Sequence, residues 1–293
     1  MNILLTGASG FVGAHLAMAL SRHHRVWGCY FSTPLNYAGV HPYRIDLRKG
    51  RAVESLEQLP IDLVVHAACK IKAQPIHSES PAQAAYRENR HLMDTVLSLR
   101  KPIVYASSTV VHWNRDLPYL HSRREDEQRV IDSGLDYAIL RPSAPYGPRL
   151  LQHKPAHQES FHTLANWVRY APIVPLIGSG EYRRQPLHVH DFAAAIVALI
   201  DRPLPCRAFD VGGKTAHSFK DIIDIMKQHC RRKPISVPLP KWAVVKLATH
   251  LPDFDPSLLD AVDEDELADS SALSALTQVS FRGFQAGVPD VFR

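Results

Sequence analysis

The stretch TGASGFVG at residues 6–13 decides the fold of this chain of 293 residues. Its glycines at positions 7, 10 and 13 follow the apolar run NILLT (2–6) and precede FVGAHLAMALSR (11–22), whose apolar residues recur at helical spacing. Glycine permits a tight turn, a close approach of the backbone to a bound group, and close packing of a helix on a strand. The spacing therefore predicts a buried strand, a glycine turn and a helix in succession.

The helix that follows this turn makes it a candidate anion site. The first N–H groups of a helix have no partner within the helix and attract phosphate. A glycine triplet alone is weak evidence, but its position between an N-terminal strand and a helix is typical of dinucleotide-binding turns. A turn that binds nothing is the alternative. We expect the pyrophosphate of a dinucleotide to bind here, at Gly7, Gly10, Phe11, Val12 and Gly13.

Short apolar runs alternate with longer helical stretches as far as residue 142. The predicted strands are 25–31, 43–47, 61–68, 102–108 and 136–142, and the predicted helices are 81–100 and 119–133. Such alternation implies βαβ units, and hence a parallel sheet covered by helices on both faces. The predicted fold class is α/β, a Rossmann-type doubly wound parallel sheet with a smaller C-terminal substrate-binding subdomain.

The second half of the chain is less regular. The stretch APYGPRLLQHKPAHQ (144–158) predicts a loop, and a helix is expected at 158–170. A helix capped by Asp191, a strand at 208–213 and two or three further helices follow, with the acidic stretch 260–269 as a solvated helix face. We expect residues 1–146, with 186–213 returning to them, to form a dinucleotide-binding domain, and 147–185 and 214–293 to form the substrate-binding subdomain.

Composition argues against several classes of protein. The net charge is +5, from 34 basic and 29 acidic residues, and the basic residues are dispersed rather than gathered on one stripe as in a nucleic-acid binder. No apolar run reaches the roughly 18 residues of a membrane span. The four cysteines are far apart and no secretory signal opens the chain, which favours the cytoplasm. The expected partner is therefore a small molecule, not nucleic acid or a membrane.

The 17 histidines do not predict a metal site. They show neither HExxH nor a Cys/His ligand spacing. His188 and His190, two apart on a predicted strand, would point to opposite faces. We expect no bound metal.

The spacing GxxGxxG resembles that of the extended branch of the short-chain dehydrogenase/reductase superfamily. This branch includes nucleotide-sugar epimerases, dehydratases and reductases such as the dTDP-4-dehydrorhamnose reductases. The motifs YRIDL, VVHAAC, YRENR, YASSTVV, LRPSAPYGP and GSGEYRRQPLHVHDFA follow in the family's order. The resemblance implies adenine contacts from Asp46 and Leu47, ribose-side contacts from Ala67 and Ala68, a cofactor-side Asn89, a catalytic Ser108, Pro142 and Ser143 near the nicotinamide, and Arg184 at a substrate phosphate.

The stretch LPYLHSRREDEQRV (117–130) carries the remaining catalytic candidates. Tyr119 and Arg123 are four apart, so on a helix they share one face. The resemblance implies that Tyr119 exchanges a proton with the substrate oxygen while Ser108 holds that oxygen. Arg123 stands where the family has a lysine that binds the ribose and lowers the pKa of the tyrosine.

Arginine changes this arrangement in part. An unperturbed tyrosine has a pKa of about 10, and a positive charge about 5 Å away lowers it by roughly two units. Arg123 supplies that charge but cannot join a proton relay, because guanidinium does not release its proton. The alternative is an ordinary helix tyrosine with arginines in surface ion pairs, for which Glu125, Asp126 and Glu127 are partners.

The choice of nicotinamide cofactor depends on the end of the second strand, WGCYFSTP. A carboxylate there would bind ribose hydroxyls and repel a 2′-phosphate, and none is present. Tyr30, Ser32 and Thr33 could donate hydrogen bonds to such a phosphate, and Arg44 could pair with it. We expect NADP, with NAD as the alternative.

Three functions remain open. The first is an NADP-dependent oxidoreductase acting on a carbonyl of a polar, possibly nucleotide-sugar, substrate, with Tyr146 and Arg149 in a loop that faces it. The second is a sugar epimerase or dehydratase with tightly held NAD. The third is a catalytically silent NAD(P)-binding scaffold or sensor, which the Arg123 replacement favours. The resemblance also implies a homodimer.

Overall fold

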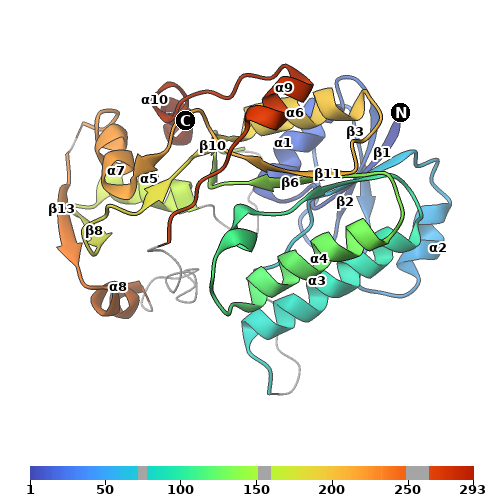
Figure 1. Cartoon of the computed structure of the whole chain (residues 1–293), viewed down its shortest axis with the longest axis horizontal. Coiled ribbons are helices and arrows are strands. Elements are labelled where there is room, and N and C mark those ends of the chain that lie inside the picture. The colour runs from blue at the N-terminus through green and yellow to red at the C-terminus, as the bar shows by residue number, and fades with distance from the viewer. Residues whose placement is uncertain (72–77, 151–159, 232, 249–263) are drawn as a thin grey trace.

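A seven-stranded sheet in the order β11-β6-β5-β4-β1-β2-β3 runs through the larger part of the molecule (Figure 1). The structure is a computed structural model and describes residues 1–71, 78–150, 160–231, 233–248 and 264–293. All neighbouring strands of this sheet are parallel. The strands are β1 (Asn2–Thr6), β2 (Arg25–Tyr30), β3 (Val40–Arg44), β4 (Leu63–His66), β5 (Ile103–Ala106), β6 (Tyr137–Pro142) and β11 (Arg207–Val211).

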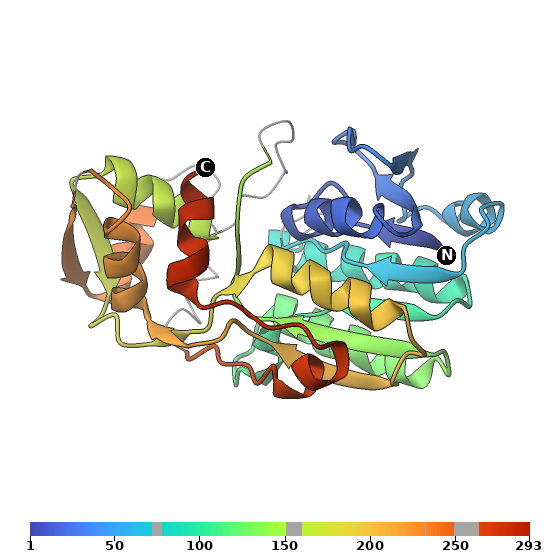
Figure 2. The ribbon, with the colours of Figure 1, turned by 90° about the horizontal axis from the view of Figure 1, so that it is seen from above.

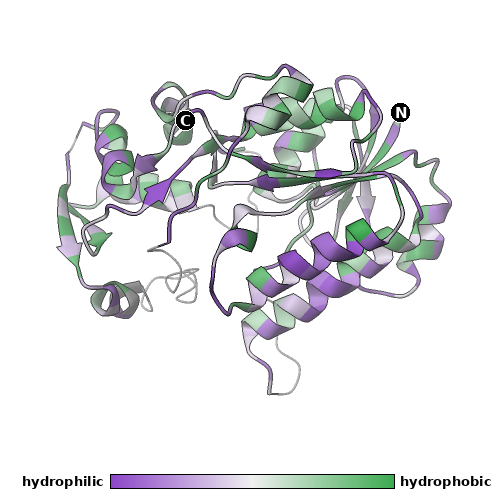
Figure 3. Cartoon of the chain, in the orientation of Figure 1, coloured by the Kyte–Doolittle hydropathy of each residue, from purple (hydrophilic) through white to green (hydrophobic). Residues whose placement is uncertain are grey.

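Helices cover both faces of the sheet, which confirms the predicted fold class. On one face α1 packs on α6, and α6 packs on α9; on the other, α3 packs on α4 and α2 (Figure 1). In Figure 3, α1 and α6 are mostly apolar, whereas α3 and α4 carry many hydrophilic residues. The bounds are α1 (Phe11–Leu20), α2 (Ala52–Glu57), α3 (Pro81–Ser98), α4 (Pro118–Asp132), α6 (Val189–Ile200) and α9 (Ser271–Thr277).

The strands divide their side chains between two apolar layers. In β1, Ile3 and Leu5 belong to the core cluster that contains α1 and α6 residues, whereas Leu4 belongs to the cluster that contains α3 residues. This alternation follows from the two-residue period of a strand. Because both faces are buried, every residue of NILLT after Asn2 is apolar or, at Thr6, hydrogen-bonded.

The C-terminal part adds a smaller lobe beside the main sheet (Figure 2). Three two-stranded sheets pair β7 (Pro145–Tyr146) with β10 (Leu187–His188), β8 (Ile173–Ile177) with β13 (Ile235–Leu239), and β9 (Arg183–Arg184) with β12 (His217–Ser218). The remaining helices are α5 (Ser160–Tyr170), α7 (Phe219–Lys227), α8 (Lys241–Ala248), α10 (Phe284–Gly287) and the 3₁₀ helices η1 (Thr109–His112) and η3 (Val288–Phe292). Within the described residues, no helix is both long and apolar enough to cross a membrane.

Several sequence predictions need correction. The third strand is Val40–Arg44 rather than 43–47, and α2, β8 and β13 were not predicted. His188, not Asp191, caps α6, because its ring accepts from the His190 N–H, while Asp191 binds Arg282 instead. The rings of His188 and His190 therefore lie 5.0 Å apart, not on opposite faces.

The acidic stretch also differs from its prediction. Its described part, from Glu264, is not a helix but lies along β9, where Glu266 forms a β-bridge with Arg184. Residues 260–263 of that stretch lie outside the described residues, as do 151–158 of the predicted loop and the first two residues of the helix predicted at 158–170.

Candidate active site

The glycine turn between β1 and α1 forms a tight cradle of backbone. Gly7 has φ +71°, which favours glycine, and a Cβ there would lie 2.6 Å from the Ala68 nitrogen. A Cβ on Gly13 would lie 2.0 Å from the Gly7 oxygen. Gly10, the N-cap of α1, offers no side-chain cap, and Phe11 opens a first turn without an acidic residue. These features fit an anionic ligand such as a pyrophosphate.

The loop after β4 closes one side of this cradle. The Ala68 N–H donates to the Thr6 hydroxyl at 3.2 Å, and Ala67 lies against Gly7. Asn89 of α3 fixes the same loop, because its side chain both accepts from the Lys70 N–H and donates to the Lys70 carbonyl, each at 2.8 Å. The two alanines and Asn89 are thus brought together beside the glycine turn.

The far end of the cradle is polar. Tyr30, at the end of β2, pairs in register with Arg44 of β3, and the exposed Ser32 and half-buried Thr33 follow. The pairing of Tyr30 with Arg44 puts a cation beside the strand end, a placement that the loop sequence alone did not reveal. Arg44 has no ion-pair partner among the described residues.

Asp46 belongs to an ion-pair network. Arg48 donates from Nε to its carboxylate at 2.7 Å, and this hydrogen bond holds the pKa of Asp46 below its usual range. Arg48 also pairs with the buried Glu88, which Lys70 reaches at 2.7 Å. Leu47 is buried in the core. The predicted adenine contacts therefore lie on a rigid segment, with the Asp46 carboxylate already engaged by Arg48.

Ser108, Tyr119 and Arg123 meet at the carboxyl end of β5. Ser108 caps η1 immediately after that strand, and Tyr119 lies in the first turn of α4. Ser108 lies close enough to Tyr119 to lower the pKa of the Tyr119 hydroxyl. The Arg123 guanidinium lies 5.6 Å from the centre of the Tyr119 ring. The predicted spacing thus produces one cluster.

The pKa of Tyr119 differs from the sequence expectation. Burial raises the pKa of Tyr119 well above 10, and its interaction with Cys69 raises it further, whereas Arg123 and Ser108 lower it. The direction expected of Arg123 is therefore right, but burial outweighs it. At neutral pH Tyr119 carries its proton, which suits a proton donor better than a base.

Arg123 is not a surface residue. It is 1% exposed, and its guanidinium binds the buried Asp126 at 3.3 Å. Its neighbours have other partners: Arg124 donates to the Val111 and Trp113 carbonyls, Glu125 accepts from Tyr86, and Glu127 binds Arg141. The alternative interpretation, in which Arg123 forms an ion pair on the surface, is therefore wrong. Its buried Nε has no hydrogen-bond partner among the described residues and could donate to a ribose hydroxyl.

Cys69 is a member of this cluster that the sequence prediction missed. It follows Ala68 directly, and its thiol donates to the Lys70 carbonyl at 3.6 Å, while Tyr119 and Asn89 lower the pKa of the thiol. Burial raises the pKa of the thiol, although the residue as a whole is exposed. Its position directly after VVHAA was the available signal, but a lone cysteine shows no pattern from which a role could be predicted.

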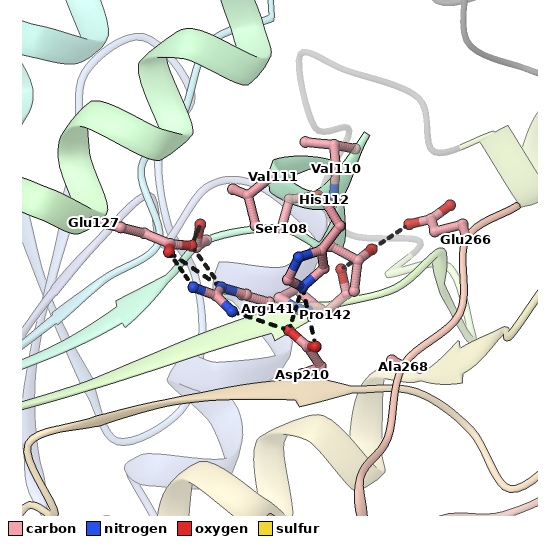
Figure 4. A network of polar contacts seen from close by, with 12 residues as sticks. Ser108, Val110, Val111, His112, Glu127, Arg141, Pro142, Asp210, Glu266 and Ala268 are labelled. Carbon is pink, nitrogen blue, oxygen red and sulfur yellow. Dashed lines mark hydrogen bonds and ion pairs between the residues drawn. The ribbon is translucent and has the colours of Figure 1, made fainter. Parts of the chain in front are cut away.

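A polar network supports the cluster from the sheet side (Figure 4). Arg141 binds Glu127 at 2.6 Å and Asp210 at 3.4 Å, and Asp210 contacts the His112 ring at 2.9 Å. Glu127 also accepts from the Ser107 hydroxyl at 2.5 Å. This network ties β5, β6, β11 and α4 together behind Ser108.

The strand-end residues Pro142 and Ser143 are both buried next to this network. The Thr109 hydroxyl donates to the Pro142 carbonyl at 3.4 Å, and the Ser143 hydroxyl donates to the Gln185 carbonyl at 2.5 Å. The two residues therefore join the carboxyl edge of the sheet, near Ser108, to the smaller lobe.

The three predicted substrate residues do not gather at one point. Tyr146 forms β7, not a loop, and is fully buried among Phe161 and Phe284. Arg149 donates to the His162 carbonyl and the Asn166 side chain of α5. Their hydrogen bonds and packing hold the smaller lobe together.

Arg184 is closer to the catalytic edge, through Glu266. Its Nε lies 3.5 Å from the Glu266 carboxylate, and it also donates to the Glu264 carbonyl. Glu266 in turn accepts from Thr109 at 2.7 Å (Figure 4) and from the Ala144 N–H at 3.1 Å, a bond that the figure does not draw. A carboxylate from the chain itself thus binds the arginine predicted to bind a phosphate.

Comparisons with known proteins agree with this fold. Residues 3–212 match the model of the NAD dependent epimerase/dehydratase family. A dTDP-glucose 4,6-dehydratase of Streptomyces griseus is 27% identical over 264 residues, 77% of each chain. The structure of a UDP-glucuronic acid 4-epimerase from Bacillus cereus, in complex with UDP-glucuronic acid and NAD, has a TM-score of 0.75 and 20% identity, covering 100% of this chain and 98% of that one.

A relative of another kind also matches. The mitochondrial NADH dehydrogenase [ubiquinone] 1 alpha subcomplex subunit 9 of Arabidopsis thaliana is 26% identical over 137 residues, 46% of this chain and 32% of its own length. The family match covers most of the chain, including the glycine turn and the Ser108–Tyr119–Arg123 cluster. The protein belongs to the NAD dependent epimerase/dehydratase family, within the extended branch of the short-chain dehydrogenases/reductases.

Proposed function

We propose that this protein is an oxidoreductase that transfers hydride between NADP(H) and a carbonyl or hydroxyl group of a polar small molecule. The observation that carries the proposal is the loop after β4. Ala68 of this loop lies against the glycine turn, and the next residue, Cys69, is near enough to Tyr119 for each group to shift the pKa of the other. A dinucleotide bound at the glycine turn would therefore have its reactive end close to a tyrosine, a serine and a cation.

The bound nicotinamide would supply or accept the hydride. Tyr119, like an ordinary tyrosine, is protonated at neutral pH, and burial raises its pKa further; it would donate this proton to the substrate oxygen as hydride arrives. Ser108 orients that oxygen by hydrogen bonding. An alkoxide is far more basic than a phenolate, so a weakly acidic tyrosine still transfers its proton downhill. Reduction of a carbonyl is the direction that this protonation state favours.

Tyr30, Ser32 and Arg44 support NADP over NAD. The end of β2 lacks a carboxylate, and Arg44 lies in register beside Tyr30. The related epimerase structure contains NAD, so tightly held NAD is the competing cofactor. In that case the reaction would begin by oxidation, as in an epimerase or dehydratase, and Tyr119 would have to act as a base against its raised pKa.

The substrate is less constrained. Arg184 could receive a substrate phosphate only by exchanging its contact with Glu266. We therefore propose a polar substrate and retain a nucleotide sugar as one member of that class. A homodimer and a cytoplasmic location are part of the proposal because of the family resemblance and the unpaired cysteines, respectively.

A catalytically silent NAD(P)-binding scaffold is the second candidate. Two observations favour it: Arg123 replaces the lysine of the family, and the Arabidopsis relative is a subunit of NADH dehydrogenase. Such a protein would bind the dinucleotide at the glycine turn and have no turnover. The intact Ser108–Tyr119 pair is the argument against it.

Calorimetric titration of nucleotide-free protein with NADPH and with NADH tests these alternatives. Tight NADPH binding, retained in Tyr119→Phe, would support the reductase and justify a screen of carbonyl substrates. Selective NADH binding would favour the epimerase or dehydratase. Binding without turnover on any carbonyl would favour the scaffold, and binding of neither nucleotide would overturn the proposal.

A further inference from the structure

The replacement of lysine by Arg123 creates a physical problem inside the protein. Arg123 is the largest fully buried side chain, and its guanidinium is bulkier than an ammonium group. A buried cation without a counter-charge is strongly destabilising. The chain must therefore provide a counter-charge that also fits the planar guanidinium of Arg123.

Asp126, one turn further along α4, is that partner. It is 2% exposed, and its Oδ2 accepts from Arg123 at 3.3 Å and from the Tyr105 hydroxyl of β5 at 3.4 Å. The guanidinium lies 5.4 Å from the Tyr105 ring and 5.6 Å from the Tyr119 ring. Arg123 is thus held between two aromatic rings by one carboxylate, which is itself fixed by a second element of the fold.

We propose that Asp126 is a positioning residue: it holds the Arg123 guanidinium beside Tyr119 and partly neutralises the charge that reaches Tyr119 and Cys69. Asp126 touches neither candidate reacting group, so it acts through Arg123. The inference deepens the proposed function and rests on it for the catalytic role of Tyr119.

Cys69 provides a reporter of this charge. Arg123 lowers the pKa of the Cys69 thiol and Asp126 raises it, in addition to the larger effect of burial. Other groups around the pair stay constant in the test: Tyr105 on β5, the neutral His66 on β4, Asn89 on α3, and Tyr119, Glu125 and Arg129 on α4. A change in either charged partner should therefore appear in the reactivity of Cys69.

The experiment measures the rate at which iodoacetamide alkylates Cys69 as a function of pH, without cofactor. The parent protein carries Cys206→Ser and Cys230→Ser, which leaves Cys69 as the accessible thiol because Cys29 is buried. Asp126→Asn, Arg123→Gln and their combination are compared with the parent. Asp132→Asn, an exposed aspartate on the same helix, is the matched control.

The proposal requires shifts in opposite directions. Asp126→Asn should lower the apparent pKa of Cys69 and Arg123→Gln should raise it, and a shift of about one unit changes the thiolate fraction about tenfold below the pKa. The double variant should lie between them. General loosening of the site would instead lower the pKa in both single variants, because it relieves burial; shifts in the same direction, or none, would overturn the proposal.

Stability supplies a second measurement. Asp126→Asn leaves the buried Arg123 cation without its carboxylate, and Arg123→Gln leaves Asp126 with only Arg129, 3.6 Å away, as a cationic partner; the double change removes both buried charges. The double variant should therefore unfold at a higher temperature than either single variant. If the single variants do not fold, the stability of the double variant still tests the ion pair. A double variant that is no more stable than the single variants would contradict the pairing of Arg123 with Asp126.

The alkylation experiment can fail or succeed independently of the proposed function. Alkylation requires neither NADPH binding nor turnover. Failure of NADPH to bind would remove the proposed function and leave the opposite shifts of Cys69 intact. Binding of NADPH together with unchanged Cys69 reactivity would remove only the role of Asp126.

Discussion

The glycine turn and the tyrosine helix differ in how closely they follow the pattern of their family. Residues 6–13 match it, and the structure shows why: a Cβ at Gly7 or Gly13 would collide with backbone atoms. The helix at 118–132 keeps the tyrosine but replaces the lysine with Arg123, and it buries this arginine on Asp126. One region is constrained by the backbone and the other by charge.

This difference shows which part of a site tolerates change. A backbone collision has no compensation nearby, so the glycines must remain. A buried charge can be exchanged for another if a counter-charge is added within reach, and Asp126 lies three residues from Arg123. The catalytic end can therefore depart from the family pattern while its geometry persists.

The largest expected effect is that of Tyr119→Phe. If Tyr119 donates the proton, turnover should fall by about 10²–10⁴-fold, while calorimetry should show nearly unchanged cofactor affinity. Tyr86→Phe, which removes an exposed hydroxyl bonded to Glu125, is the control. Unchanged turnover in Tyr119→Phe would show that Tyr119 does not donate the proton. The tyrosine helix would then have no catalytic role.

Gly13→Ala should have the next largest effect. Its methyl group would lie 2.0 Å from the Gly7 oxygen, so the turn must open, at a cost of about 3 kcal/mol in the free energy of unfolding. Gly10→Ala is the matched control, because its methyl group would meet the same oxygen at 3.4 Å, and a loss under about 1 kcal/mol is expected. Denaturant unfolding and NADPH titration measure both variants; equal losses would show that the cradle is not tightly packed.

The two regions were also unequally predictable from the sequence. The glycine turn and the strand–helix alternation follow from local patterns, and the parallel sheet follows from the alternation; the choice of Ser108, Tyr119 and Arg123 follows from the family resemblance. The burial of charged side chains, in contrast, does not follow from local patterns. Arg123 and Asp126 belong to a charged run, RREDE, that is typical of a solvated helix face, yet both are buried against β5.

Long-range partners were hidden for the same reason. Glu266 lies 82 positions from Arg184 in the sequence, and no local pattern predicts that it binds this arginine. His188 lies in strand β10, as the sequence predicts, but it also caps α6, because its ring accepts the His190 N–H. Side-chain pairing across the fold, rather than secondary structure, limits what the sequence alone predicts.

Glu266→Gln tests the ion pair between Glu266 and Arg184, the arginine predicted to bind a substrate phosphate. The amide keeps an acceptor for Thr109 but leaves Arg184 without its carboxylate, and a loss of about 2 kcal/mol in unfolding free energy is expected, because both side chains are only 10–12% exposed. Glu264→Gln is the control: its pair with Arg115 is more exposed, and a loss below about 1 kcal/mol is expected. Equal losses would mean that the Arg184–Glu266 pair behaves as a surface contact.

An effect of similar size, seen only in acid, concerns the buried histidines of α1 and α6. His15 of α1 is 2% exposed, and its ring lies 5.0 Å from that of His190. Burial, with repulsion from His190, lowers the pKa of His15 to about 4. The unfolded chain binds this proton at about pH 6.5, so the unfolded state gains protons first as the pH falls.

The contribution of neutral His15 is therefore complete above about pH 6.5 and is lost as the pH falls toward 4. At pH 5 the loss should be about 2 kcal/mol relative to pH 7.5. In His15→Gln the side chain cannot be protonated but can still donate to the Pro148 carbonyl, as His15 does at 3.1 Å. Urea unfolding at both pH values should show a smaller acid loss in this variant than in the parent or in His91→Gln, an exposed residue on α3. If the acid loss is unchanged, another group titrates, and His188, whose pKa is also lowered to about 4 by burial, is the next to replace.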